Sequence, residues 1–121
     1  MQHPLIGAWT ATLTSSGRFG SDYATASFHP DGTMTITISG STAHGVWQGA
    51  DSGAARFRAL GPLGPAEGQS GWHDFTFEVR VAPGGTSLAL DGTHERPTPS
   101  GAPSVTRISG SGERLTCVPG S

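Results

Sequence analysis

The chain has 121 residues, a length that suits one domain rather than two. Hydrophobic residues make up 34% of it, charged residues 13%, and the formal net charge is -2. This balance argues against a strongly basic nucleic-acid-binding face and against disorder driven by like charges. With 19 glycines and 9 prolines, the chain has little room for long helices.

The cysteine content and the first residues bear on the compartment. The single cysteine, Cys117, allows neither an internal disulfide nor a cysteine-type zinc site. Residues 1–5 lack the basic and apolar regions of a signal peptide, and no stretch approaches the roughly 18 apolar residues that span a bilayer. We therefore expect a cytoplasmic protein. All basic residues are arginine, and lysine and asparagine are missing, which indicates a GC-rich bacterial genome.

Strand alternation dominates the first half of the chain. Residues 7–14 form a first predicted strand, followed by a hairpin over residues 23–39 whose turn is His29-Pro30-Asp31-Gly32. Within it, residues 33–39 place threonines on one face and Met34, Ile36 and Ile38 on the other. Two short strands follow at 45–49 and 55–60.

The second half continues the same pattern. Residues 72–82 form the longest predicted strand, with His73, Phe75 and Phe77 on one face and Asp74 and Thr76 on the other. A Pro-Gly-Gly turn leads to strands at 86–91 and 93–96, and a last strand covers 105–109. We expect the tail from Gly110 onward to be frayed.

About eight short strands joined mostly by tight turns predict an all-β protein. The architecture that removes exposed strand edges is an antiparallel up-and-down eight-stranded barrel, and we expect it to enclose an internal cavity. It would form a single domain over residues 1–121. A two-sheet sandwich is the alternative.

Two short motifs suggest a family. Gly7-Ala8-Trp9 opens the first strand and Thr106-Arg107-Ile108 lies in the last. Together they resemble the calycin superfamily, and within it the small bacterial lipocalin-like barrels. The resemblance implies that Trp9 packs across a closed barrel end and that the Arg107 guanidinium lies against its indole. The chain differs from secreted lipocalins in lacking a signal peptide, disulfide cysteines and a C-terminal helix.

Small and aromatic residues are mixed on the predicted inner faces. Ala11, Ala55 and Ala59 alternate there with large side chains, which favours an apolar cavity for one small ligand over a fully packed interior. The register leaves open whether Tyr23 or Ala24 faces inward. The candidate ligand contacts are Tyr23, Met34, Ile36, Trp47, Phe57, His73, Phe75, Phe77 and His94.

The ionisable candidates lie near the predicted mouth. His73 shares a face with Phe75, so its imidazole could orient a polar group or act as an acid or base. Either His94 or Glu95 must face inward, and the Tyr23 phenol could bond a ligand carbonyl. No histidine spacing matches a metal motif, so we expect no metal and no cofactor.

Four functions remain open at this point. The first is binding of a small, largely apolar molecule, and the second is a cofactor-independent isomerase, cyclase or dehydratase of specialised metabolism that uses His73, Tyr23 and Glu95. The third is haem binding through one histidine, as in nitrobindin-like barrels, and the fourth is an interaction module without a cavity. We expect neither a nucleic acid nor a membrane as partner, and a homodimer is left open.

Overall fold

The computed structural model describes residues 3–15, 22–38, 40–62, 72–97 and 101–116, so Cys117 lies outside the described residues. Within these ranges there is no α-helix, and therefore none long and apolar enough to cross a membrane. One short 3-10 turn, η1, covers Asp51–Gly53. The strands are β1 (Gly7–Ser15), β2 (Asp22–Phe28), β3 (Thr33–Ile38), β4 (Ser41–Gly49), β5 (Ala54–Pro62), β6 (Trp72–Val81), β7 (Ser87–Arg96) and β8 (Ser104–Arg114).

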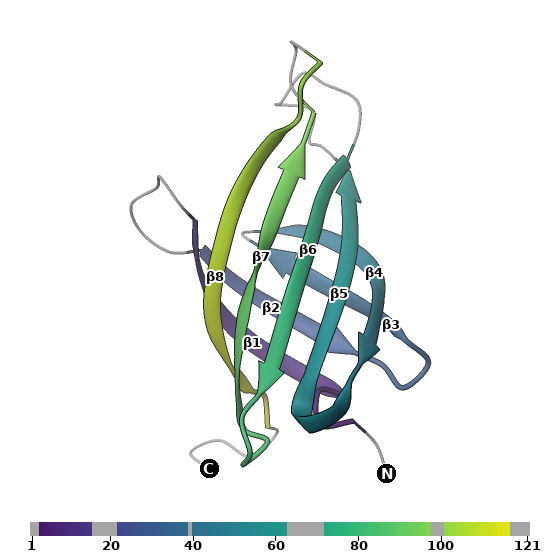
Figure 1. Cartoon of the computed structure of the whole chain (residues 1–121), viewed down its shortest axis with the longest axis vertical. Helices are drawn as coiled ribbons and strands as arrows, with labels where there is room; N and C mark the ends of the chain where they lie inside the picture. The colour runs from purple at the N-terminus through teal and green to yellow at the C-terminus, as the bar shows by residue number, and fades with distance from the viewer. Residues whose placement is uncertain (1–2, 16–21, 39, 63–71, 98–100, 117–121) are drawn as a thin grey trace.

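The strands form one closed antiparallel barrel (Figure 1). Each strand pairs with the next along the chain, and β8 returns to pair with β1, from Trp9 opposite Arg114 to Ser15 opposite Ile108. The predicted up-and-down eight-stranded barrel is therefore confirmed, and the sandwich alternative is wrong. The predicted segments 86–91 and 93–96 are a single strand, β7.

The alternation of side chains sets the two faces of the wall. On β3, Met34 and Ile36 are buried in the interior, as predicted. The pairs that the sequence left open are now assigned: Ala24 is buried, while Tyr23 lies on the outer face with 75% of its surface exposed. On β7, His94 has the same parity as the buried Leu90 and faces inward, and Glu95 faces outward.

One end of the barrel is closed by the segment before β1. Leu5 is fully buried there, and its carbonyl oxygen accepts a hydrogen bond from the Trp9 indole nitrogen at 2.8 Å. His3 fixes this segment: its Nδ1 accepts the Leu5 amide proton at 3.1 Å, so its Nε2 is the nitrogen that donates to the Ala54 carbonyl oxygen at 3.0 Å. We call this end, at which the chain begins in Figure 1, the closed end.

An arginine covers Trp9 as the resemblance implies, but it is Arg114 rather than Arg107. The Arg114 guanidinium carbon lies 4.3 Å from the indole centroid. Its nitrogens donate to the carbonyl oxygens of Gly85 and Ile6, both at 2.8 Å, and of Pro4. The expectation for Arg107 is wrong for a simple reason. Strand β8 does not fray at Gly110 but continues to Arg114. Arg107 and Arg114 are separated by an odd number of positions along this strand, so the two arginines face opposite sides of the wall.

Gly92 lies within β7 and not in a turn. A Cβ at this position would lie 2.0 Å from the Thr76 carbonyl oxygen and 2.9 Å from Cδ1 of Phe77. The Phe77 ring takes up this inner-face position, directly opposite Gly92 in the register, and stacks on Phe57 with centroids 5.1 Å apart. The glycine is therefore a place of close packing within a strand and not a turn between two strands.

Replacing Arg114 tests the closed end. In Arg114→Met, loss of the cation–π contact and of charged hydrogen bonds to backbone carbonyls should lower the free energy of unfolding by about 2–4 kcal/mol. The matched control is Arg107→Met, which removes an exposed ion pair to Asp91 at 2.9 Å and should cost less than about 1 kcal/mol. Urea denaturation of both variants measures the difference. Equal losses, or a larger loss for Arg107→Met, would contradict this description of the closed end.

Candidate functional site

Side chains fill the barrel interior from the closed end to its middle. Trp9, Leu13 and Phe77 are each only 1–2% exposed. These side chains are therefore enclosed by their neighbours. Four of the predicted ligand contacts belong to this set of buried side chains, at 1–2% exposure: Met34, Ile36, Phe57 and Phe77.

The opposite end, where β6 begins and β5 and β7 end, has a different lining; we call it the open end (Figure 1). His73, Phe75 and His94 face inward there and are only partly buried. In the register, Phe75 lies between Ala59 on β5 and His94 on β7, and His73 lies opposite Gly61. Two aromatic side chains of β6 thus face very small residues on the neighbouring strand.

The two imidazoles at the open end are hydrogen-bonded to each other. Nδ1 of His73 lies 2.8 Å from Nε2 of His94. The His94 ring stacks on Phe75, with centroids 4.6 Å apart and an angle of 11° between the rings. One of the two nitrogens must donate and the other accept, so a single proton lies between them.

The structure does not bring the other predicted site residues to this place. Trp47 faces inward near the closed end, where its indole nitrogen donates to the His29 carbonyl oxygen at 2.8 Å and its ring meets the His3 ring edge-on. Tyr23 and Glu95 are exposed on the outer face. Of the three residues proposed for catalysis, only His73 lines the open end.

The neighbouring carboxylate of Asp74 is engaged on the outer face. Its oxygens accept hydrogen bonds from Arg58, at 3.1 Å from Nε and 2.8 Å from Nη2. This contact raises the pKa of the Arg58 guanidinium above its ordinary value. Adjacent strand residues face opposite sides, so Asp74 and His73 form no dyad, as the strand parity predicted.

The His73–His94 contact was missed by sequence reasoning, although a signal for it exists. The two histidines lie on different strands, so their spacing along the chain does not place them together. Counting outward from Ala82 and Ser87, which flank a four-residue turn, pairs Phe75 with His94 and brings His73 diagonally beside it. Among the residues that the structure describes, no group of three or more His, Cys, Asp or Glu side chains is arranged to hold a metal ion.

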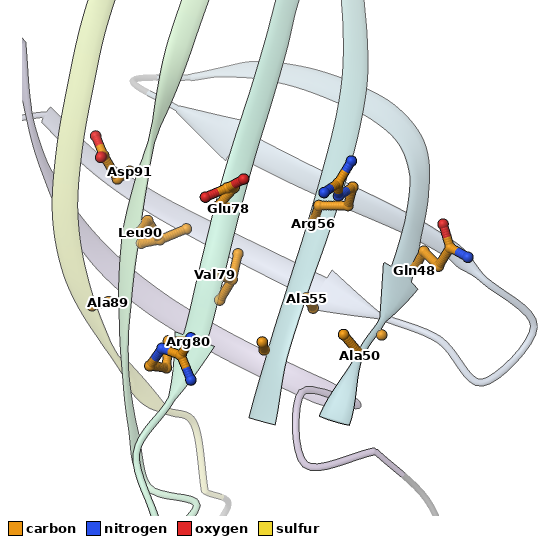
Figure 2. A pocket seen from close by; sticks show the side chains of 12 residues that line it. Gln48, Ala50, Ala55, Arg56, Glu78, Val79, Arg80, Ala89, Leu90 and Asp91 are labelled. Carbon is orange, nitrogen blue, oxygen red and sulfur yellow. The ribbon is translucent and has the colours of Figure 1, made fainter. Parts of the chain in front are cut away.

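Two of the hollows on the outside of the wall lie away from the open end. One, of about 590 Å³, lies over β4 to β7, where Arg56, Glu78 and Asp91 follow one another across three strands (Figure 2). The other, of about 790 Å³, contains Tyr23 among threonines of β1, β2 and β3. Tyr23 is thus separated from the histidine pair by the barrel wall.

Comparisons with protein-family models, with curated proteins and with solved structures found no match. The closed eight-stranded antiparallel barrel is consistent with the lipocalin-like fold that the sequence motifs suggested. The site geometry is therefore the basis on which a function can be inferred.

Proposed function

We propose that the protein binds a small, largely apolar molecule at the open end of the barrel, with the ligand against Phe75 and its polar group on the His73–His94 pair. The observation that carries the proposal is the 2.8 Å contact between two inward-facing imidazoles beside an aromatic ring. The proposal keeps the expected single cytoplasmic domain over residues 1–121, with neither a nucleic acid nor a membrane as partner.

The apolar part of the ligand would be a flat ring system. Phe75 and His94 are nearly parallel and only partly buried, so they favour a third ring in the same orientation. Ala59 and Gly61 on the adjoining strand put no bulk opposite Phe75 and His73. Covering apolar surface there contributes about 25 cal/mol per Å². Because the closed end is filled by Leu5 and Trp9, the ligand would enter and leave at the open end.

The polar part of the ligand would be a hydroxyl group. A hydroxyl can enter the bond between His73 Nδ1 and His94 Nε2, because it accepts from the imidazole that donates and donates to the one that accepts. A carbonyl group could only accept and would leave one nitrogen unpaired. This chemistry favours phenols, enols and alcohols over hydrocarbons.

The shared proton also supports a second candidate function, a cofactor-independent isomerase. One imidazole can take a proton from a substrate while its partner returns one to a different atom, which is the proton balance of a keto–enol isomerisation. His73 and His94 would carry this step. Tyr23 and Glu95 would have no part in it because they lie outside the wall.

Binding can be tested with 2-naphthol, a fluorescent planar alcohol, and with naphthalene as its hydroxyl-free control. We expect the wild-type protein to bind 2-naphthol about two- to thirteen-fold more tightly than naphthalene, the effect of one net hydrogen bond of about 0.5–1.5 kcal/mol. His94→Phe keeps an aromatic ring and should abolish the difference. His44→Phe, an exposed position on the outer face of β4, should retain it. Equal affinities of the wild type and His94→Phe for 2-naphthol would contradict the proposal.

The isomerase candidate can be tested with 2-tetralone, an apolar ketone whose α-protons exchange with solvent. The wild-type protein should accelerate deuterium incorporation from heavy water, as followed by proton NMR, and both His73→Phe and His94→Phe should lose this acceleration. Binding of 2-naphthol without any acceleration of exchange would favour a carrier and exclude this activity. Acceleration that persists in both variants would remove the histidine pair as its source.

A further inference from the structure

We propose that His73 and His94 also form a binding site for a divalent transition-metal ion, with Cu²⁺ as the best fit and water completing its coordination. This inference goes beyond the proposed ligand binding and does not depend on it. It rests on two imidazole nitrogens from neighbouring strands that meet on the inner face of the open end.

The two nitrogens are close enough to be ligands of one metal ion. Bonds of about 2.0–2.1 Å at right angles would place two ligand nitrogens about 2.8–3.0 Å apart, and tetrahedral bonds would place them about 3.3–3.4 Å apart. His73 Nδ1 and His94 Nε2 are 2.8 Å apart. Cu²⁺ and Ni²⁺ take tetragonal geometry with nitrogen ligands, whereas Zn²⁺ is usually tetrahedral. Among these ions Cu²⁺ binds nitrogen ligands most tightly.

The two rings are already positioned by packing. His94 is stacked on Phe75 at 4.6 Å, and Phe75 in turn lies 6.1 Å from the His73 ring, nearly parallel to it. A rotation of each imidazole about its Cβ–Cγ bond would turn the two lone pairs from facing each other to meeting at a point beside them. The rotation breaks the hydrogen bond between the two nitrogens, and the two bonds to the metal ion replace it.

Proton and charge balance set the limits of the site. The proton between the rings must move to the far nitrogen of its own imidazole, so that His73 carries it on Nε2 and His94 on Nδ1. A neutral pair then binds the ion without net proton release, and a protonated pair releases its extra proton, so acid weakens binding. The adjacent carboxylates of Asp74 and Glu95 lie on the outer face and leave the coordination to the two nitrogens and water.

The test uses the full chain with a short peptide ahead of Met1, so that no free α-amine next to His3 can bind the probe. With Cu²⁺ as the probe, we expect one bound ion whose electron paramagnetic resonance spectrum shows coupling to imidazole nitrogens. Competition calorimetry against glycine should give an affinity at least ten-fold weaker for His73→Phe and for His94→Phe. His44→Phe should bind as the wild type does, and Ni²⁺ should bind more tightly than Zn²⁺.

Cu²⁺ affinity that is the same in the wild type and in the two phenylalanine variants would overturn the inference. If either variant fails to fold, nitrogen NMR of the wild-type imidazoles with Zn²⁺ as probe decides instead. Shifts at His73 Nδ1 and His94 Nε2 support the site. Shifts confined to His3, His29 or His44 overturn it.

Discussion

The contact between Arg114 and Trp9 is the interaction on which the rest of the barrel depends. It joins the last strand to the first, and the same guanidinium binds the carbonyl oxygens of Gly85 and Ile6. The Arg114 guanidinium thus stabilises both the pairing of the last strand with the first and the packing at one end of the barrel. Leu5 completes the closure, because the Trp9 indole hydrogen-bonds its carbonyl group. At the other end, the inward-facing side chains of His73, Phe75 and His94 are only partly buried.

The difference between the two ends of the barrel relates the packing to the proposed function. The stack of Phe57 on Phe77 needs a glycine beside it, and Gly92 meets that need within β7. Between this stack and the closed end the core is dense, so a ligand deep in the barrel would have to displace aromatic side chains. Nearer the open end, the imidazoles of His73 and His94 are only partly buried beside Phe75. Binding is therefore proposed at the open end, where polar groups are held in place without being sealed off.

The strands could be predicted from the sequence because period-two alternation is local, as in residues 33–38, and so could the barrel, because short turns allow few other topologies. The site depended on facts that are not local. Which of Tyr23 and Ala24 faces inward is a matter of one residue in register. Which arginine covers Trp9 depended on where β8 ends. Its last five residues, Gly110 to Arg114, include no apolar side chain, so no hydrophobic alternation marks them as a strand. The His73–His94 bond joins residues on two strands and becomes visible only when those strands are paired.

The central claim is that the inner face of the open end is the binding surface. The most direct measurement is NMR mapping of the shifts that 2-naphthol causes along the chain, combined with nuclear Overhauser contacts from the naphthol ring. The account predicts contacts to His73, Phe75 and His94, and no shifts around Leu5 and Trp9. Contacts to Tyr23 in one outer hollow, or to Arg56 and Glu78 in the other, would contradict it.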